Sequence, residues 1–471
     1  MARGLDTMAG WKLILAAGVM AFSGGIAARA ADLGTDCCAD LEQRISELEA
    51  TTARKGNRKV SLTVSGFINE AVMWWDDGEE QNTYVVTNDS GRTRVRFRGK
   101  AQIAKDWEAG YRLEIGVRSA RSDRVDQGGP FGELGSRSTG PTLDIRYSLW
   151  SLKNKTYGEV LIGRTESASQ GITEVNVTQT ADIVRNSDVE DWAAGFQLVA
   201  ANIAGSQGLS AIEWRRLVND DFIQPGDGDR LQAVQYVSPE FHGVRLEAAW
   251  GQDDYWDVGL WYEGENNEVK VEAAVAYSVN SDGSEEADAN TCIVAREVLV
   301  TGNSDDADCR QIGGSISALH KPTGLFLNFG AGWFMDSLIE ETAVFAGTGA
   351  ADTSTYYAFQ PGVEKKWHPL GKTTVYGEWF QYFGGANDRT VPTGDSLNTQ
   401  IGFGDSNIWD DEVRVYGTGI IQGIDAAAMR LYLGWRHYEA DLLLREQATG
   451  NIARSPLKDL DVIMGGALIQ F

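Results

Sequence analysis

Basic residues at every second position form the feature of this sequence with the clearest chemical potential. The run reads Arg92-Thr93-Arg94-Val95-Arg96-Phe97-Arg98-Gly99-Lys100. Because successive side chains of a β-strand point to opposite faces, a strand here places these charges on one face, which we call the basic ladder. If that strand crosses a bilayer, each arginine facing lipid near the midplane would cost roughly 2–4 kcal/mol. The pattern therefore predicts a ladder that faces a water-filled interior.

The next two segments repeat the arrangement. Polar and apolar residues alternate between positions 111 and 118, which puts Arg112 and Glu114 on the interior face. Arg146 follows the same rule, with its neighbours Ile145 and Tyr147 on the opposite face. A soluble β-sandwich with one solvated face would show the same alternation, and this alternative stays open. The basic candidates for a channel wall are Arg94, Arg96, Arg98, Arg112 and Arg146.

A long segment of residues 165–229 supplies the acidic counterpart. If it folds inward, its carboxylates would oppose the arginines and create a transverse electric field that sorts solutes by charge and size. The alternative is an external, solvated loop with scattered acids. The acidic candidates are Glu166, Glu174, Asp182, Asp188, Glu190 and Asp191.

The elements that must position these residues are membrane-crossing strands. From residue 59 to the end of the chain, segments of alternating polarity recur at about the length that crosses a bilayer at a tilt. The predicted strands are Val60–Trp74, Arg92–Ala104, Trp107–Arg118, Leu143–Leu152, Tyr157–Arg164, Arg230–Ser238, Val244–Trp250, Tyr255–Tyr262, Glu268–Val279, Ile312–His320, Leu325–Trp333, Tyr356–Val363, Thr373–Phe383, Glu412–Ile421, Ala427–Glu439 and Lys458–Phe471.

The connections between these strands alternate between short and long. Lys105-Asp106 and Lys321–Gly324 are short turns, whereas Asp76–Gly91, Ser119–Thr142, Gly384–Asp411 and Ala440–Leu457 are long and polar. Leu209–Leu217 could pass as a further strand, but bacterial single-chain barrels use even strand numbers. We therefore expect an all-β fold over residues 59–471, a 16-stranded antiparallel transmembrane barrel whose third long loop spans residues 165–229 and folds inward.

The composition indicates an exported protein. Arg3 and Lys12 precede an apolar run from Leu13 to Phe22, which is typical of a signal peptide and predicts cleavage after Ala30. No apolar stretch reaches the length of a membrane-spanning helix. The 54 Gly, the 15 Trp, 15 Tyr and 16 Phe, and the scarcity of Pro favour strands. The net charge of −25 makes a nucleic-acid partner unexpected.

Two short regions outside the strands have their own predictions. Residues 31–58 carry an amphipathic stripe that includes Leu41 and Ile45, which predicts a short periplasmic helix. Several copies could meet in a brief coiled coil, or the stripe could pack on the barrel rim. In an oxidising compartment Cys292 and Cys309 are expected to form a disulfide, with two free thiols as the alternative. Whether Cys37 and Cys38 pair within or between subunits stays open.

Signals of catalysis are weak. The histidines are His242, His320, His368 and His437, and none belongs to a HExxH, GxSxG or P-loop motif. We expect no enzymatic activity, no metal site and no cofactor. Paired carboxylates are not evidence of a hydrolase in so acidic a chain, because they are expected there by chance.

Several motifs resemble those of the general porins of alphaproteobacteria, particularly of rhizobial lineages. They are Cys37-Cys38-Ala39-Asp40-Leu41-Glu42, Ala71-Val72-Met73-Trp74-Trp75-Asp76, Leu161-Ile162-Gly163-Arg164-Thr165-Glu166 and the terminal Phe471. The resemblance implies a homotrimer in the outer membrane, in contact with lipopolysaccharide, with passive diffusion of ions and small hydrophilic solutes. It also implies that Arg164 is a constriction residue and that the barrel assembly machinery recognises Phe471.

The dense basic ladder and the cysteine-bearing loop depart from the family pattern. A substrate-specific channel therefore remains an alternative, as does a plugged adhesin or receptor barrel. An outer-membrane enzyme is the weaker alternative.

Overall fold

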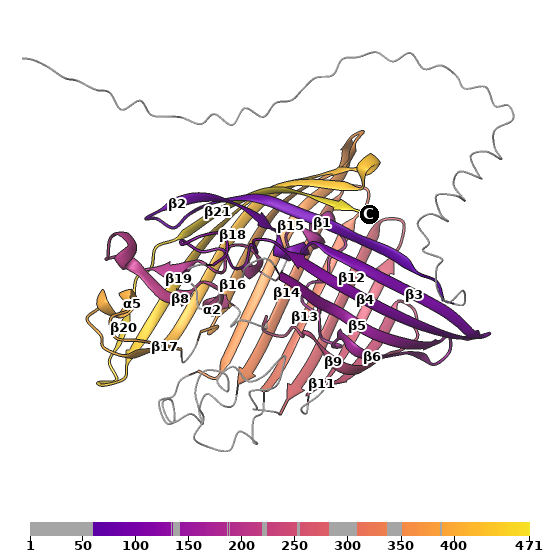
Figure 1. Ribbon diagram of the computed structural model, residues 1–471, viewed down its shortest axis with the longest axis horizontal. Helices are drawn as coiled ribbons and strands as arrows, with labels where there is room; N and C mark the ends of the chain where they lie inside the picture. The colour runs from indigo at the N-terminus through magenta and orange to yellow at the C-terminus, as the bar shows by residue number, and fades with distance from the viewer. Residues whose placement is uncertain are drawn as a thin grey trace, which may run out of the picture. The chain divides into compact units, whose positions relative to one another are not determined.

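Sixteen antiparallel strands pair in a closed ring in the computed structural model. It describes residues 60–132, 134, 142–185, 187, 189–218, 224–251, 255–281, 309–336, 351–386 and 389–471. Strand β1 (Thr63–Asp76) pairs with β21 (Leu460–Gln470) and closes the ring, as the indigo and yellow strands of Figure 1 show. Main-chain hydrogen bonds between Gly66 and Phe471 complete the seam. The predicted fold class is confirmed.

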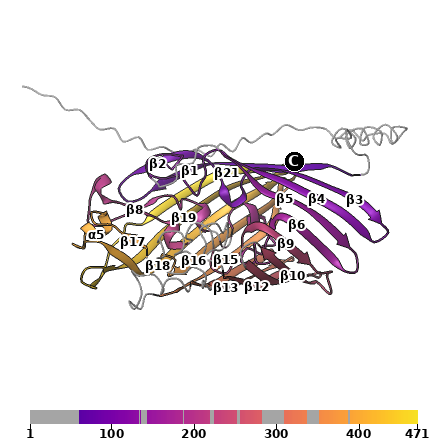
Figure 2. The same cartoon turned by 60° about the horizontal axis from the view of Figure 1, so that its bottom comes forward.

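The other strands follow one another around the wall. Figure 2 shows neighbouring strands side by side, and strands of opposite walls crossing at an angle. They are β3 (Arg94–Ala104), β4 (Trp107–Arg118), β5 (Thr142–Asn154), β6 (Gly158–Glu166), β9 (Arg230–Val237), β10 (Val244–Gly251), β11 (Tyr255–Glu265), β12 (Val269–Asn280), β13 (Cys309–His320), β14 (Leu325–Asp336), β15 (Thr353–His368), β16 (Gly371–Phe383), β18 (Ser406–Ile424) and β19 (Met429–Glu446).

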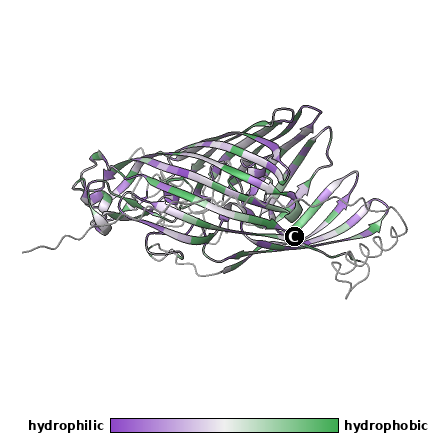
Figure 3. Ribbon diagram, turned by 90° about the horizontal axis from the view of Figure 1, so that it is seen from above, coloured by the Kyte–Doolittle hydropathy of each residue, from purple (hydrophilic) through white to green (hydrophobic). Residues whose placement is uncertain are grey.

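The strands are apolar outside and polar inside, the reverse of a soluble barrel. In β13, Ser315 and Ser317 are buried on the inner face, whereas Ile312 and Ile316 are 46% and 44% exposed on the outer face. Alternating bands of opposite hydropathy run along the strands in Figure 3. This polarity fits a wall whose outer surface meets hydrocarbon.

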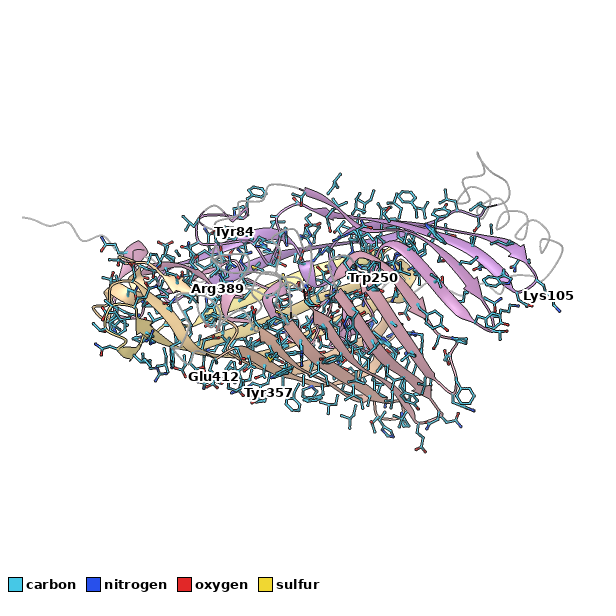
Figure 4. All side chains as sticks on the ribbon, turned by 90° about the horizontal axis from the view of Figure 1, so that it is seen from below. Tyr84, Lys105, Trp250, Tyr357, Arg389 and Glu412 are labelled. Carbon is cyan, nitrogen blue, oxygen red and sulfur yellow. The ribbon has the colours of Figure 1, made fainter. Side chains whose placement is uncertain are left out.

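The short turns gather at one end of the barrel and the long loops at the other. Figure 4 labels Lys105 at the tip of the turn between β3 and β4. In the turn after β13, Gly324 has a φ of +81°, and a Cβ there would lie 2.3 Å from the carbonyl oxygen of Glu364. Only glycine fits this turn without strain.

Three of the predicted long loops are shorter than expected, because strands continue into them. Residues 76–91 contain β2 (Gln81–Thr87), which pairs with β1. Strands β18 and β19 pair from their turn as far as Ser406 and Glu446. Two more short strands extend this hairpin, β17 (Thr390–Val391) and β20 (Ile452–Arg454).

Residues 165–229, the third loop, contribute no strand to the barrel beyond the ends of β6 and β9. Leu209–Leu217, the ambiguous segment, contains β8 (Leu209–Glu213), which pairs only with β7 (Gln197–Val199) in a separate two-stranded sheet. The short helical elements of the described residues are η1 (Asp89–Gly91), η2 (Gln179–Asp182), η3 (Val189–Asp191), η4 (Gly205–Gly208), α2 (Arg215–Val218), α5 (Ser396–Thr399) and η6 (Asp425–Ala427).

The predicted signal peptide and periplasmic helix lie outside the described residues. Within the described residues, no helix is long and apolar enough to cross a membrane.

Candidate functional site

The basic ladder lies on the inner face of β3, beside the polar face of β4. Arg96 stands directly opposite Glu114, and Arg98 stands directly opposite Arg112. Phe97 and Leu113 form the corresponding pair on the outer face. Side chains directly opposite one another on neighbouring strands are in contact range, so the two strands together present one charged surface to the lumen.

Four arginines converge on a single carboxylate in this surface. Glu114 is fully buried. Its Oε2 accepts hydrogen bonds from Arg96 Nε at 2.5 Å and Arg112 Nη2 at 2.8 Å. Its Oε1 accepts from Arg146 Nε at 3.0 Å and lies 3.5 Å from Arg94 Nη1. We call these five residues the arginine cluster; its positive charges outnumber its negative charge by a wide margin.

A β-bulge in β5 completes the cluster. The pairing of β4 with β5 shifts between Glu114 and Ile115, so Arg146 is the extra residue and both Arg146 and Tyr147 turn inward. The expectation that Tyr147 faces outward is therefore wrong. Its ring is 2% exposed and stacks under the Arg112 guanidinium, whose carbon lies 3.2 Å from the ring centroid.

An interruption between β2 and β3 brings a second carboxylate into the lumen, which the sequence reasoning missed. Residues 88–93 leave the ladder of main-chain hydrogen bonds, and η1 carries Asp89 inward, where it is 2% exposed. Asp89 pairs with Arg92 at 2.9 Å and lies 3.4 Å from Arg118 Nε. Asn88 caps η1, the only sequence signal of this feature.

The third loop is attached to inner-face side chains of successive strands. Asp257 of β11 accepts from the backbone N–H and hydroxyl of Ser169 at 2.7 and 2.6 Å. Ser315 of β13 accepts from the N–H of Val175 at 3.0 Å. Further attachments are Val177 N–H to Ser317, Gln179 N–H to Glu364 and Gln360 Nε2 to the carbonyl of Val184. Because polar groups of β11, β13 and β15 take part, this half of the loop follows the inner wall.

The loop then reaches β19, where a buried ion pair holds it. Arg436 Nε donates to Glu378 Oε1 at 2.7 Å, and Arg436 Nη1 donates to the carbonyl of Val189 at 3.1 Å. The guanidinium also lies over the rings of Trp192 and Phe380. Apolar side chains of the loop, including Trp192, form one buried cluster with inner-face residues of β1, β18, β19 and β21. The lumen on that side is therefore filled.

The predicted acids occupy different positions. Glu174, Glu190 and Asp191 line a cavity of about 440 Å³, the first cavity, together with Arg118 and Arg146. Glu174 also pairs with Arg185 at 2.9 Å. Asp182 binds Arg430 of β19 at 2.9 Å instead, and Glu166 lines a second cavity. Asp188 lies outside the described residues.

Charge dominates the first cavity. Nine arginines and eight carboxylates line it. Arg92 belongs to the basic ladder, and the charged residues that were not among the predicted constriction residues are Asp89, Arg92, Arg118, Arg121, Asp123, Arg124, Asp144, Arg185, Arg215, Asp227, Asp229 and Arg230.

The second cavity, also about 440 Å³, lies on the side of the short turns. Arg98, Arg112, Tyr147 and Glu166 contribute to its lining. Since Arg146 borders the first cavity while Arg112 borders the second, and both bind Glu114, the arginine cluster stands between the two cavities.

Arg164 differs from the other predicted basic residues. It pairs with Ser148 on the outer face of β5, and its Nε donates to the carbonyl of Ile145 at 3.0 Å, beside the bulge. Its side chain also borders the first cavity. Arg164 thus flanks the arginine cluster from the opposite face of the sheet.

Cys309 begins β13 and is buried. Cys292, its predicted disulfide partner, lies outside the described residues, so the disulfide stays a prediction. Within the described residues, no group of three or more His, Cys, Asp or Glu side chains could hold a metal ion.

Comparisons with known proteins give a family match and several similar solved structures. A family model described as Gram-negative porin matches residues 15–391. Among solved structures, an anion-selective porin from Comamonas acidovorans has 13% identity and a TM-score of 0.48, covering 88% of this chain and 100% of that chain. OprB of Pseudomonas putida has 11% identity and a TM-score of 0.48, covering 92% and 97%.

OmpT of Vibrio cholerae, in its trimer form, has 10% identity and a TM-score of 0.46, covering 88% of this chain and 99% of that chain. No curated protein matches the chain. The family model, which spans most of the chain, carries the assignment.

Proposed function

The chain belongs to the Gram-negative porin family, and we propose that solutes cross it between the third loop and the arginine cluster. The protein is an outer-membrane channel for passive diffusion. The observation that carries the proposed route is the position of the arginine cluster between two cavities, of which the first is also lined by acids of the third loop. Because the third loop fills the lumen beside β1, β18, β19 and β21, ions and small hydrophilic solutes would pass on the side of the arginine cluster.

The same residues would act as the selectivity filter. Glu174, Glu190 and Asp191 border the first cavity with Arg118 and Arg146, so a solute there experiences charges of both signs. At the arginine cluster, a single carboxylate faces four guanidinium groups, so positive charge is in excess. Rings of fixed charge of one sign favour the opposite ion, so anions should pass this point more easily than cations.

Reversal potentials across planar bilayers in a salt gradient test this route. The wild-type channel is expected to favour chloride over potassium, and Arg96→Gln to lower that preference at least twofold. Arg245→Gln is the matched control, since Arg245 faces the lumen from β10 but lines neither cavity. Equal reversal potentials for wild type and Arg96→Gln would overturn the proposed route.

We propose a homotrimer on the basis of the outer wall. Glu70 lies on the outer face of β1, between Ile68 and Val72, which are both 51% exposed. It accepts hydrogen bonds from the hydroxyl groups of Thr87 and Thr93 at 3.1 Å. A carboxylate in a lipid-facing wall is costly, which favours a neighbouring subunit over this face.

The mass of the detergent-solubilised protein tests the assembly. Three chains are expected for the wild type and one chain for Val72→Arg. A wild-type monomer would contradict the proposal.

The remaining proposals follow the motif resemblance. They are membership of the alphaproteobacterial, rhizobial-type subgroup, contact with lipopolysaccharide, recognition of Phe471 by the assembly machinery, and absence of enzymatic activity. A substrate-specific channel is the second candidate function, and it is favoured by Arg98, which borders the second cavity without a side-chain hydrogen bond or ion pair among the described residues.

A further inference from the structure

The carboxylates of the second cavity are all paired with cations. Glu108 lies 3.4 Å from Lys100, and Glu159 lies 3.3 Å from Lys153. Glu166, at the end of β6, lies 3.8 Å from Arg230. Each of these acids therefore already has a cation of its own, and only Glu166 also attracts the two arginines that border the same cavity.

The two arginines of this lining, Arg98 and Arg112, lack a full negative counter-charge. The side chain of Arg98 makes no hydrogen bond or ion pair with the part of the chain that the structure describes, although it lines the cavity. Arg112 shares Glu114 with three other arginines, and its Nε is buried without a hydrogen-bond partner among the described residues.

Arg98 and Arg112 also stand directly opposite each other across β3 and β4. Like charges in that position destabilise a sheet, so the pair is poorly explained by stability alone. An anion held between them would remove the repulsion. Arginine presents its N–H donors in a planar fork that matches carboxylate, phosphate and sulfate oxygens.

We infer that the second cavity binds a compact oxyanion with two negative charges, held by Arg98 and Arg112 on the side of the short turns. This inference rests on the proposed route, because the ligand must reach the cavity through the channel. Its volume of about 440 Å³ leaves room for a small oxyanion together with part of its hydration shell. Each water of that shell takes roughly 30 Å³.

The ring of Tyr147 supports one of the two arginines that would bind the oxyanion. The guanidinium carbon of Arg112 lies 3.2 Å from the ring centroid of Tyr147, which is itself buried, so the ring covers one side of the guanidinium. Arg98 is exposed and free to adjust to the ligand. The site thus combines a donor held against a buried ring with an exposed donor, which suits a short dicarboxylate as well as sulfate or phosphate.

Single-channel chloride conductance, measured at constant ionic strength while sodium sulfate or sodium succinate replaces part of the chloride, tests the site. Constant ionic strength is required because salt screens exposed charges. A saturable fall in conductance with either anion is expected, and the more effective anion identifies the preferred geometry. If the chloride conductance falls without saturation when either sulfate or succinate replaces chloride, the inference is wrong. Chloride steps would still be present in that case, so the channel function would stand.

Substitutions at Arg98 separate a site from a general charge effect. Arg98→Gln is expected to raise the half-blocking concentration at least tenfold, whereas Arg98→Lys should retain part of the block because it keeps the charge. Folding should be intact, since the Arg98 side chain is exposed and makes no hydrogen bond or ion pair within the described residues. Arg245→Gln removes a lumenal arginine elsewhere and should leave the block unchanged. An equal shift in Arg98→Gln and Arg245→Gln would contradict a defined site.

Discussion

Glu114 is the one carboxylate of the arginine cluster, and four guanidinium groups share it. A buried carboxylate that accepts from several guanidinium groups stabilises them only while it is charged and present. The period-two pattern predicted that Glu114 and the basic ladder share the lumenal face, because alternation alone decides direction in a regular strand. It could not predict the inward turn of Tyr147, because Asp144-Ile145-Arg146-Tyr147 continues the alternation while the β-bulge adds one residue.

Removing the charge of Glu114 should destabilise the barrel. In Glu114→Gln four arginines lose their shared counter-charge inside the wall, and breaking buried pairs of this kind costs about 3–5 kcal/mol. The midpoint of urea unfolding, followed by the mobility of folded protein in gels, measures the loss. Glu265→Gln is the control, because it removes an ion pair with Lys321 at a short turn and should not move the midpoint. Unchanged unfolding of Glu114→Gln would show that the arginine cluster is not held by this carboxylate.

The third loop is the element that determines which part of the lumen stays open. Strand parity predicted its extent, because an odd strand number was excluded. Its path was not predictable, since the path depends on side chains far away in the sequence, such as Ser315 with Val175 and Arg436 with Val189. Dependence on distant residues also explains why β2 and the full length of the hairpin of β18 and β19 were not predicted. In both places strand pairing continues beyond the membrane-crossing length.

The Arg436–Glu378 pair should control how tightly the loop is held. Arg436→Met alone leaves Glu378 buried without its cation, so the loop should open and trypsin should cleave it after Arg185 or Arg215 at least tenfold faster. Arg436→Met combined with Glu378→Met removes both charges and should recover most of the resistance, because an apolar pair carries no desolvation cost. Equal cleavage rates for the single variant and the wild type would contradict this role.

Acid should release the loop at its contact with β19. Burial alone would raise the pKa of Asp182, but the nearby Arg430 guanidinium, with further help from Arg94 and Arg185, holds that pKa below its ordinary value. A lowered pKa stabilises the folded state fully above the ordinary value of about 3.9, and the stabilisation disappears as pH falls through the lowered value. Resistance to an acid-active protease should therefore persist at pH 5 and decline below pH 4. The loop of Asp182→Asn should be less resistant to this protease than the wild-type loop at pH 5, and its resistance should decline less than that of the wild type as pH falls.

At the scale of the whole molecule, sixteen strands close a wall that is apolar outside and polar inside, and the third loop fills one side of the lumen. The strand number was predictable because each crossing needs a similar length of alternating residues. The filling of one side of the lumen was not predictable, because it arises from packing of Trp192 and its neighbours against β1 and β19. The route that we propose runs past the arginine cluster, and the proposed selectivity depends on that route.

Chemical modification of Arg98→Cys during single-channel recording tests this route most directly. A bulky thiol-reactive reagent attached at position 98 should lower the conductance of each open channel by more than half, because the side chain borders the second cavity. The wild-type protein, exposed to the same reagent, should keep its conductance. Complete labelling of Arg98→Cys, verified by mass, with no change in conductance would contradict a passage along the arginine cluster.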